Sequence, residues 1–230
     1  MRERGMLTPE DGRSQIAEEM RAIKRPLIKK AFSVDVSAEN HHNLIMVTSS
    51  VPGEGKSYSS INLAVSIAME LDRTALLVDA DVAKPSIAQY LGFRAKKGLV
   101  DYLMEERISL SDIMIKTDLP KLSILPAGRQ YHYSTELLAS ENMLTLLDEL
   151  SRRYHDRIII FDSPPILATS EAEVLANQVG QVVVVVEAVK TSQHVLQEAM
   201  AKIPNANISG LILNKSRVKG GGSSYGYGYG

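Results

Sequence analysis

The sequence predicts one α/β domain built on a doubly wound, mostly parallel sheet flanked by helices. Three observations lead to this prediction. Short apolar runs of the length of buried strands alternate along the chain with segments of helical periodicity. Several of these runs end in a carboxylate or in a glycine-bearing turn. A chain of 230 residues, 44% of them hydrophobic, is long enough for one large core and short for two.

The N-terminal region is expected to form an arm followed by one amphipathic helix. Residues 1–13 are polar and include Pro9 and Gly12, so we expect a loose arm there. From Ser14 onward apolar residues recur at spacings of three and four, which predicts a helix with one apolar stripe. These residues are Ile16, Met20, Ile23 and Leu27.

Charged residues on the other face of this helix follow one another at intervals of three. They are Glu18, Arg21 and Lys24. The pattern fits two interpretations equally well. One is a ladder of ion pairs on a solvated surface, worth roughly a few tenths of a kcal/mol, and the other is a contact surface.

The next segment has the features of a phosphate-binding loop. An apolar strand at residues 44–48 passes into a glycine-bearing turn, and a helical pattern begins at Ser57. Such a turn directs backbone N–H groups and the positive end of the helix dipole at one spot. Lys56 can reach the β- and γ-phosphates, and the Ser57 hydroxyl can ligate Mg²⁺. The residues expected to bind the nucleotide here are Pro52, Gly53, Glu54, Gly55, Lys56, Ser57 and Tyr58.

This turn is a P-loop except that Ser50 replaces the usual first glycine. The alternative is a chance strand–turn–helix with a solvated lysine. The combination Pro-Gly-Glu-Gly-Lys-Ser, with a strand before it and a helix after it, favours nucleotide binding.

Two further apolar runs end in carboxylates. Residues 75–78 read as a strand buried on both faces, and Asp79 and Asp81 follow it. The strand at residues 157–161 ends at Asp162. Ligands bind at the carboxyl edge of an open parallel sheet, so these carboxylates are expected beside the P-loop. We expect Asp162 to complete a Mg²⁺ site, directly or through a bound water.

The chemistry expected at this edge depends on the phosphoryl acceptor. Asp79 or Asp81 can align and partly deprotonate an incoming hydroxyl, while Lys56 and the metal stabilise charge on the transferred group. If the hydroxyl belongs to water the protein is an ATPase, and if it belongs to a side chain the protein is a kinase. As an alternative, Asp79 is a switch residue that senses the γ-phosphate without catalysing its transfer.

The remaining segments continue the alternation of strands and helices. Strands are predicted at residues 122–125, 182–186 and 210–214, and a helix around residues 141–154. Ser170 and Glu173 have the spacing of a capping box that opens another helix. Since strands and helices alternate throughout, a parallel, doubly wound sheet follows.

The C-terminal segment breaks these patterns. Residues 219–224 have the composition of a flexible linker, and Tyr225, Tyr227 and Tyr229 alternate with glycines on a chain that is not expected to fold. These tyrosines either stick weakly to surfaces or present a row of hydroxyls.

Composition excludes several classes of function. A net charge of −1 argues against a nucleic-acid partner, and the absence of cysteine excludes disulfides and thiolate metal sites. His41 and His42 have no Cys, Asp or Glu at ligand spacing nearby apart from Glu39, so we expect solvated loop residues there and no metal site. No apolar run approaches the ~20 residues needed to span a bilayer, and there is no signal-peptide core. We therefore expect a cytosolic protein unless a partner tethers it.

Together these motifs resemble those of the bacterial tyrosine kinases, or BY-kinases, which accompany exopolysaccharide and capsule synthesis. The resemblance extends from Glu18 to the tail. Its carriers are the Pro-Gly-Glu-Gly-Lys-Ser loop, residues 76–81 with the following Lys84-Pro85-Ser86, and the strand ending at Asp162-Ser163-Pro164-Pro165. Residues 125–128, residues 136–138 and the terminal tyrosines also match.

The resemblance implies a protein-tyrosine kinase that uses ATP and Mg²⁺ to phosphorylate its own tail, between neighbours in a ring-shaped homo-oligomer. The implied catalytic residues are Lys56, Asp79 and Asp81, the metal ligands Ser57, Asp81 and Asp162, and the acceptors Tyr225, Tyr227 and Tyr229. Asn214 resembles a residue that contacts adenine in related P-loop proteins, although packing at a strand end explains it equally well. A helix contact of the family falls on Glu18, Arg21 and Lys24, which makes that ladder an expected subunit interface.

The family also implies partners and a location. Its kinases need a membrane-embedded activator of the polysaccharide chain-length or co-polymerase type, either fused or separate, and the lack of a membrane segment here predicts a separate chain. A tyrosine phosphatase is a further expected partner. We expect a cytoplasmic protein that this activator recruits to the inner face of the membrane. The expected domains are an arm with an oligomerisation helix (1–43), a kinase domain (44–218) and a phosphoacceptor tail (219–230).

Three segments of the sequence depart from the family pattern. Lys24 replaces the second arginine of the helix contact and loses its bidentate fork. Val82-Ala83 stands where a Leu-Arg pair is usual, and residues 131–135 replace a proline-rich segment. The competing class, a switch ATPase of the partition and division-site type, carries a signature lysine where this chain has Val51, followed by Pro52. A nucleotide-dependent regulatory subunit without transfer activity is a third interpretation.

Overall fold

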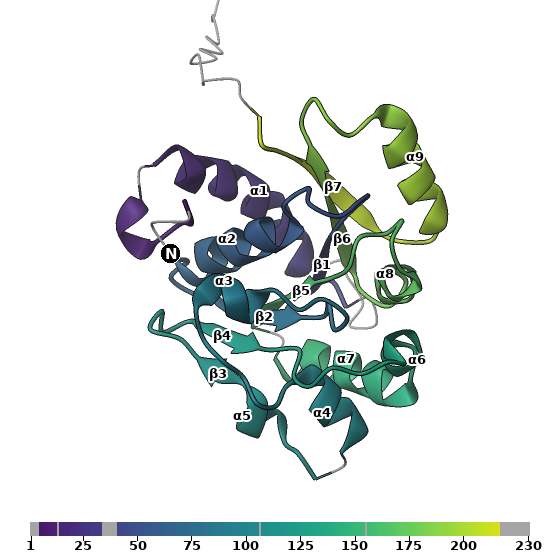
Figure 1. Ribbon diagram of the computed structural model, residues 1–230. Coiled ribbons are helices and arrows are strands. Elements are labelled where there is room, and N and C mark those ends of the chain that lie inside the picture. Colours follow the sequence, from purple (N-terminus) through teal and green to yellow (C-terminus); the bar gives the residue numbers. More distant parts are fainter. Residues whose placement is uncertain (1–4, 13, 34–40, 106, 155, 217–230) are drawn as a thin grey trace, which may run out of the picture.

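A seven-stranded sheet forms the middle layer of the structure, a computed structural model that describes residues 5–12, 14–33, 41–105, 107–154 and 156–216 (Figure 1). The strands are β1 (Leu44–Ser49), β2 (Thr74–Asp79), β3 (Ile115–Lys116), β4 (Leu122–Leu125), β5 (Arg157–Asp162), β6 (Gln181–Glu187) and β7 (Ile208–Asn214). Their order is β3-β4-β2-β5-β1-β6-β7, and only β3 runs antiparallel to its neighbour. The predicted doubly wound, mostly parallel sheet is confirmed.

Burial explains why the central strands read as unbroken apolar runs. Every residue of β1 is buried, and so is every residue of β2 and β5 after the first. β7 lies at the edge and leaves Leu211 and Leu213 exposed. Since β1, β2 and β5 are parallel neighbours, their carboxyl ends meet at one edge of the sheet.

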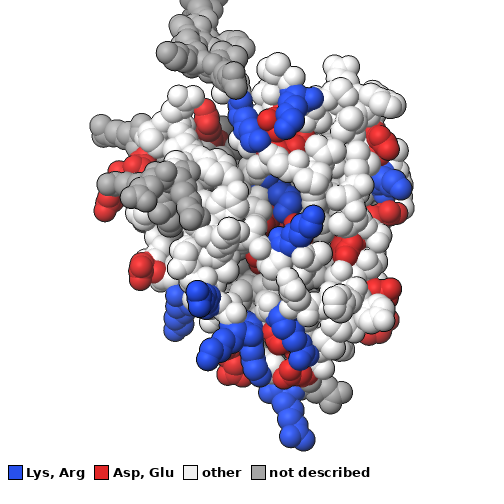
Figure 2. Space-filling model, viewed as in Figure 1, with Lys and Arg blue, Asp and Glu red and all other residues white. Residues whose placement is uncertain are grey.

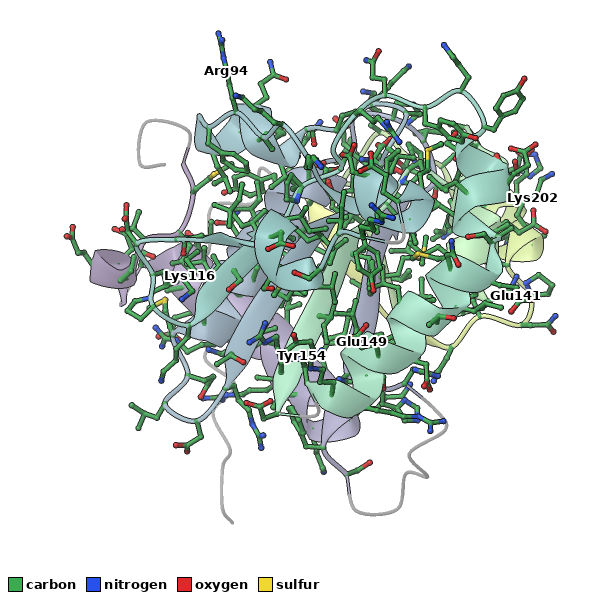
Figure 3. The ribbon with its side chains drawn as sticks, turned by 90° about the horizontal axis from the view of Figure 1, so that it is seen from below. Arg94, Lys116, Glu141, Glu149, Tyr154 and Lys202 are labelled. Carbon is green, nitrogen blue, oxygen red and sulfur yellow. The ribbon has the colours of Figure 1, made fainter. Side chains whose placement is uncertain are left out.

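Helices cover both faces of the sheet. The helices are α1 (Gln15–Ala31), α2 (Lys56–Ala68), α3 (Ile87–Leu91), α4 (Leu99–Met104), α5 (Leu110–Ile113), α6 (Ser134–Leu138), α7 (Glu141–Arg153), α8 (Ser170–Ala176) and α9 (Gln193–Lys202). One core contains residues of α1, α2 and α3, and the other contains residues of α4 to α9. Figure 3 shows α7 lying across its face of the sheet, from Glu141 toward Tyr154. Within the described residues no helix is both long and apolar enough to cross a membrane.

The predicted placement of Lys24 on the outer face of α1 is wrong. Its side chain is 6% exposed, and its Nζ lies 2.6 Å from Ser66 O and 2.7 Å from Glu70 Oε1. The buried stripe of α1 is Ala17, Met20, Lys24 and Leu27. A lysine fits into this stripe because its long stem packs against α2 while its amine finds two oxygen partners.

The predicted loose arm is also wrong for residues 5–12. Met6 and Leu7 are 2% and 1% exposed, and the Leu7 N–H donates to Asn62 Oδ1 at 2.7 Å. A 3-10 turn, Pro9–Asp11, precedes α1. The arm is held in place by the burial of these two adjacent apolar residues. The buried Asn62 side chain also accepts the hydrogen bond of the Leu7 N–H, so this backbone group is not left without a partner.

The capping box predicted at Ser170 is displaced. The N-cap of α8 is Thr169, and α8 begins at Ser170, so Glu173 lies one position too late for the motif. The Ser170 hydroxyl lies 3.2 Å from that of Thr135 instead.

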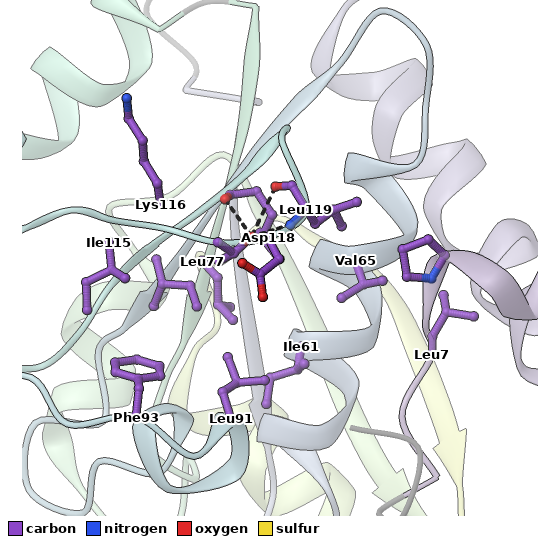
Figure 4. A pocket seen from close by; sticks show the side chains of 14 residues that line it. Leu7, Ile61, Val65, Leu77, Leu91, Phe93, Ile115, Lys116, Asp118 and Leu119 are labelled. Carbon is purple, nitrogen blue, oxygen red and sulfur yellow. Dashed lines mark hydrogen bonds between the residues drawn. The ribbon is translucent and has the colours of Figure 1, made fainter.

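A cavity of about 400 Å³ lies between the arm, α2, the α3 segment and the β3–β4 turn (Figure 4). Its walls are mostly apolar and include Leu7, Ile61, Val65, Leu77, Leu91 and Phe93. Asp118 stands at this cavity, whereas the Lys116 side chain points away from its centre.

Candidate nucleotide-binding site

The turn between β1 and α2 has the backbone shape that its glycines permit. Gly53 and Gly55 have φ angles of 90° and 100°, in the left-handed region that favours glycine. A Cβ at Gly55 would lie 2.0 Å from Asn214 Nδ2, so no side chain fits there. Because α2 begins directly at Lys56, its first N–H groups and the positive end of its dipole face this turn. The turn is therefore shaped to hold a phosphate.

Lys56 lies among the carboxylates expected from the sequence. Its Nζ is 2.7 Å from Asp81 Oδ2 and 3.5 Å from Ser57 Oγ. Burial favours the neutral amine, but the negative charges of Asp162, Asp81 and Asp79 outweigh it, and the pKa of Lys56 is raised. The lysine thus carries a positive charge at the start of α2.

Asp79 and Asp162 are neighbours in register at the ends of β2 and β5. Asp79 Oδ2 accepts hydrogen bonds from the N–H groups of Ser86 and Ile87 at 3.1 and 3.0 Å. Asp162 Oδ1 accepts one from the Ser60 hydroxyl at 3.0 Å. The second oxygen of each carboxylate, Asp79 Oδ1 and Asp162 Oδ2, is buried with no hydrogen-bond partner among the described residues.

The environment of these two acids favours a bound proton or a cation. Burial, and next the charge of Asp162, raises the pKa of Asp79 to about 7. Burial also raises the pKa of Asp162, although the positive charge of Lys56 opposes this. Two carboxyl groups that titrate high in the same site are a feature of functional sites as well as of structural networks.

The oxygen atoms at this edge suit Mg²⁺. The ion takes oxygen ligands and usually combines one or two carboxylates with phosphate oxygens and water. Asp162 Oδ2 is an oxygen of the kind that such an ion satisfies. The Ser57 hydroxyl, which follows Lys56 directly in the sequence, accepts a hydrogen bond from Ser86 Oγ at 2.8 Å and is a second oxygen at this edge. Among the described residues no group of three or more His, Asp or Glu side chains could hold a metal ion alone. Phosphate oxygens and water would have to complete the coordination.

Three residues expected to bind the nucleotide have side chains engaged with the protein itself. Glu54 is 1% exposed, and its Oε2 accepts from the Val51 N–H at 2.8 Å. Asn214 Nδ2 donates to Glu54 O at 2.8 Å, as the strand-end packing interpretation predicts. The Tyr58 hydroxyl donates to Gly5 O at 2.6 Å, which ties the arm to the first turn of α2. A contact between Asn214 and adenine stays a prediction.

Other residues of the site could not be identified from the sequence. Lys215 Nζ donates to Gly53 O at 2.6 Å and to Glu187 Oε2 at 3.0 Å, and Ser60 supports Asp162. These contacts join elements far apart in the chain, and no spacing rule indicates them. Ser86, whose hydroxyl donates to Ser57 Oγ, is different, because the sequence motif Lys84-Pro85-Ser86 indicated it.

The structure separates the three members of the predicted interface ladder. Arg21 Nη1 and Glu18 Oε1 lie 2.6 Å apart, with side chains 30% and 64% exposed, and Arg21 also donates to Gly12 O. Lys24 points inward, so it cannot extend the ladder without leaving its buried position. Tyr225, Tyr227 and Tyr229 lie outside the described residues.

Charge on the face seen in Figure 2 is mixed. Lys and Arg side chains near its middle lie beside Asp and Glu side chains, and further basic side chains gather toward its lower end. The exposed basic residues of the segment after α3, Arg94, Lys96 and Lys97, are balanced in part by a contact of 3.6 Å between Lys97 Nζ and Glu105 Oε2.

Comparisons with known proteins show which proteins the chain is similar to. A family model described as an AAA domain matches residues 42–213. The chain is 31% identical to a putative tyrosine-protein kinase, CapB, of Staphylococcus aureus, over 95% of this chain and 92% of CapB. It is 30% identical to the tyrosine-protein kinase YwqD of Bacillus subtilis, over 98% of this chain and 91% of YwqD. It is 32% identical to the putative tyrosine-protein kinase EpsB of Ralstonia nicotianae over 84% of this chain, which spans only 25% of EpsB.

Solved structures show the same likeness. The kinase domain of Escherichia coli tyrosine kinase ETK superposes with a TM-score of 0.78 at 26% identity, over 93% of this chain and 80% of that domain. The chimerical protein CapA2B2 superposes with a TM-score of 0.77 at 28% identity, over 90% of this chain and 88% of that protein.

Proposed function

The chain belongs to the bacterial tyrosine kinase family, and we propose that it transfers the γ-phosphate of ATP, with Mg²⁺, to tyrosine hydroxyls, including those of Tyr225, Tyr227 and Tyr229. The observation that carries this proposal is Asp79. Its Oδ1 is buried and has no hydrogen-bond partner in the part of the chain that the structure describes, and its pKa of about 7 suits proton transfer near neutral pH. It stands in register with Asp162 and in the same site as Lys56.

Each residue has a defined part in the proposed reaction. Asp79 Oδ1 accepts the proton of the tyrosine hydroxyl as the oxygen forms its bond to phosphorus and the bond to the ADP oxygen breaks. Lys56 offers its charge to the transferring phosphoryl oxygens in exchange for its contact with Asp81. Ser57, Asp81 and Asp162 are the proposed ligands of Mg²⁺, which supplies positive charge to the phosphates when bound. The P-loop N–H groups hold those phosphates in place.

Phosphosite mapping by mass spectrometry after incubation with ATP and Mg²⁺ tests the activity. The wild type is compared with Lys56→Met, each with and without the cytosolic segment of the activator. Phosphate on Tyr225, Tyr227 or Tyr229 in the wild type alone supports the kinase. A tail without phosphate in every condition, together with ATP turnover, favours the switch-ATPase interpretation. A tail without phosphate and no turnover favours the regulatory subunit.

We further propose that the phosphate is transferred between subunits. The ~10 residues beyond Gly220 span at most ~35 Å when extended, so the tail can reach the site of a closely packed neighbour. A Lys56→Met chain with an intact tail, mixed with an active chain that lacks the tail, should become labelled. An unlabelled Lys56→Met chain beside an active wild type would contradict transfer in trans.

The proposed assembly is a homo-oligomer, such as a ring, in which Glu18 and Arg21 contact a neighbour. The exposed Glu18 and the partly exposed Arg21 support this part, and Lys24 is left to the fold of the subunit. Arg21→Ala should lower the mass measured by light scattering. An unchanged mass would mean that Glu18 and Arg21 form only a surface ion pair within one helix. Such a pair contributes about 0.3–0.5 kcal/mol.

The cellular role is proposed from the relatives. One of them, 33% identical over 78% of this chain, is named succinoglycan biosynthesis transport protein ExoP of Rhizobium meliloti. We propose that this chain regulates exopolysaccharide synthesis or export, bound at the inner face of the membrane to a separate membrane-embedded activator, and that a tyrosine phosphatase reverses its phosphorylation. Co-purification of the chain with membranes only when the activator is present would support this arrangement.

A further inference from the structure

The Glu54 side chain faces into the protein although it belongs to the loop that should face the phosphates. Glu54 is 1% exposed, whereas the neighbouring Pro52 and Gly53 are exposed. Burial of a carboxylate is costly unless hydrogen bonds replace the lost water. The Glu54 carboxylate must therefore be tied to specific donors.

Those donors come from three places. Oε2 accepts from the Val51 N–H at 2.8 Å, within the P-loop itself. Oε1 accepts from the Glu187 N–H at 3.2 Å and from the Thr191 hydroxyl. Glu187 is the last residue of β6, and Thr191 lies beyond the end of this strand. Hydrogen bonds to an ionised acceptor are roughly twice as strong as neutral ones. One side chain thus closes the P-loop on itself and fastens it to the segment between β6 and α9.

The main chain of the loop is fastened on a second side. Asn214 Nδ2 donates to Glu54 O at 2.8 Å, and Lys215 Nζ donates to Gly53 O at 2.6 Å. Residues 53 and 54 are therefore held by the end of β7 through their carbonyl groups and by the β6–α9 segment through the Glu54 carboxylate. These contacts hold the main chain of the loop on both sides of its N–H groups.

We propose that Glu54 is a positioning residue, which preorganises the P-loop for the nucleotide through Val51, Glu187 and Thr191 without touching the nucleotide. This inference rests on the nucleotide site of the proposed function and not on the transfer of phosphate. A preformed loop binds nucleotide more tightly because less ordering remains to be done on binding. The contribution is the same for bound ATP and for the transition state, so it appears in affinity and not in turnover.

The choice of substitutions isolates the carboxylate. Glu54→Gln keeps the shape of the side chain and one acceptor oxygen. Its amide NH₂ group replaces the other oxygen and cannot accept a hydrogen bond, so one donor of the protein loses its acceptor. Thr191→Val removes one donor and keeps the volume, and Thr191→Ser keeps the hydroxyl. Glu173→Gln on the exposed side of α8 is the matched control for the loss of a carboxylate.

The measurement is the equilibrium dissociation constant of a fluorescent ADP analogue with Mg²⁺, together with the melting temperature without nucleotide. Glu54→Gln should weaken binding by about tenfold or more, and Thr191→Val by about threefold, since charge-assisted hydrogen bonds are lost. Thr191→Ser and Glu173→Gln should bind as the wild type does. The double variant of Glu54→Gln and Thr191→Val should bind better than the product of the two single effects predicts, because the two residues share one bond.

Nucleotide affinity within about twofold of the wild type in a folded Glu54→Gln protein would overturn the proposal, and so would equal effects of Thr191→Val and Thr191→Ser. A lower melting temperature with unchanged affinity would assign Glu54 to folding alone. If Glu54→Gln does not fold, the two Thr191 variants decide the question. The ADP assay needs no phosphoryl transfer, so a failure of the kinase proposal leaves this test intact. If tail phosphorylation is observed, KM for ATP should rise in Glu54→Gln with kcat within about twofold.

Discussion

Individual side chains decide how this site responds to pH. Asp79 and Asp162 are buried next to each other, and each has one oxygen without a partner among the described residues. Burial favours the protonated form of Asp79, and a proton there also removes the repulsion from Asp162, so the pKa of Asp79 is raised to about 7. The folded protein then holds a proton over a pH range in which the unfolded chain has released it.

The protein without nucleotide should therefore lose stability as the pH rises from about 4 to about 7. The unfolded aspartate releases its proton near its ordinary pKa, the folded Asp79 near 7, and between the two the unfolded state binds fewer protons. Asp79→Asn removes the contribution of Asp79 to this dependence and keeps an acceptor for the Ser86 and Ile87 N–H groups. The melting temperature of the variant relative to the wild type should rise between pH 5 and pH 8, in buffer without Mg²⁺.

Asp118→Asn, at an exposed turn before β4, serves as the control and should show a constant difference over the same range. A pH-independent difference for Asp79→Asn as well would mean that Asp79 is ionised in the folded protein throughout.

Lys24 offers a second test at this scale. Lys24→Ala leaves Ser66 O without its donor and removes a buried stem, so the free energy of unfolding in urea should fall by about 1–3 kcal/mol. Arg25→Ala, at the exposed neighbouring position, should change it by less than about 0.5 kcal/mol. Unchanged stability of Lys24→Ala, combined with a smaller oligomer, would place Lys24 in the subunit interface after all.

Positions of residues along the chain could be predicted better than the directions of their side chains. Lys56, Asp79, Asp81 and Asp162 lie together because each lies at or after the end of a parallel strand, and strand ends share one edge. Glu54 points inward because N–H and hydroxyl groups of the protein donate to it, and Lys24 because a buried backbone oxygen accepts from it. The periodicity of the sequence does not reveal such partners. Their roles in binding and catalysis stay predictions.

At the scale of elements, the segment between β6 and α9 contains an unfavourable conformation. Val189 has φ of 66° and is fully exposed, so a β-branched residue occupies the left-handed region without any packing to favour it. The Glu54 bonds to Glu187 and Thr191 hold the two ends of this segment and so maintain the strain.

Val189→Gly should consequently stabilise the protein. Relief of about 1–2 kcal/mol of strain exceeds the ~0.5–1 kcal/mol by which glycine favours the unfolded chain. The melting temperature should rise by about 1–4 °C. Val189→Ala keeps the unfavourable φ and should melt within a degree or so of the wild type, and an equal rise in both variants would point to the exposed side chain rather than to the backbone.

Long elements with a clear period were predictable, and short ones were not. The strands at β1, β2, β4, β5, β6 and β7 and the helices α1, α2 and α7 follow the predicted segments. The helices α3 to α6 contain four to six residues each, and β3 contains two, too few to show a period. These short elements form where packing against the rest of the fold stabilises them. Gly98, the N-cap of α4, is an example, because a Cβ there would lie 2.1 Å from Pro126 O.

At the scale of the whole molecule, the cavity of about 400 Å³ marks where four separate segments meet imperfectly. Val65 of α2 lines it and is 2% exposed, so Val65→Ile can place one more methyl group against its apolar wall. The free energy of unfolding should rise by about 0.5–1 kcal/mol. Val184→Ile, in a fully buried strand position away from this cavity, should instead lower it through overpacking. A loss of stability in both variants would mean that the cavity wall cannot accommodate the group.

Nucleotide binding beside Asp79 and Asp162, which each have one oxygen without a partner among the described residues, would also couple the lifetime of the protein to the energy supply of its cell. A ligand that binds only the folded chain stabilises it in proportion to the logarithm of its concentration. If ATP with Mg²⁺ is that ligand, a starved cell contains a larger fraction of transiently opened chains, and proteases act on the opened fraction. The abundance of this protein then declines with the nucleotide pool even when its synthesis is unchanged.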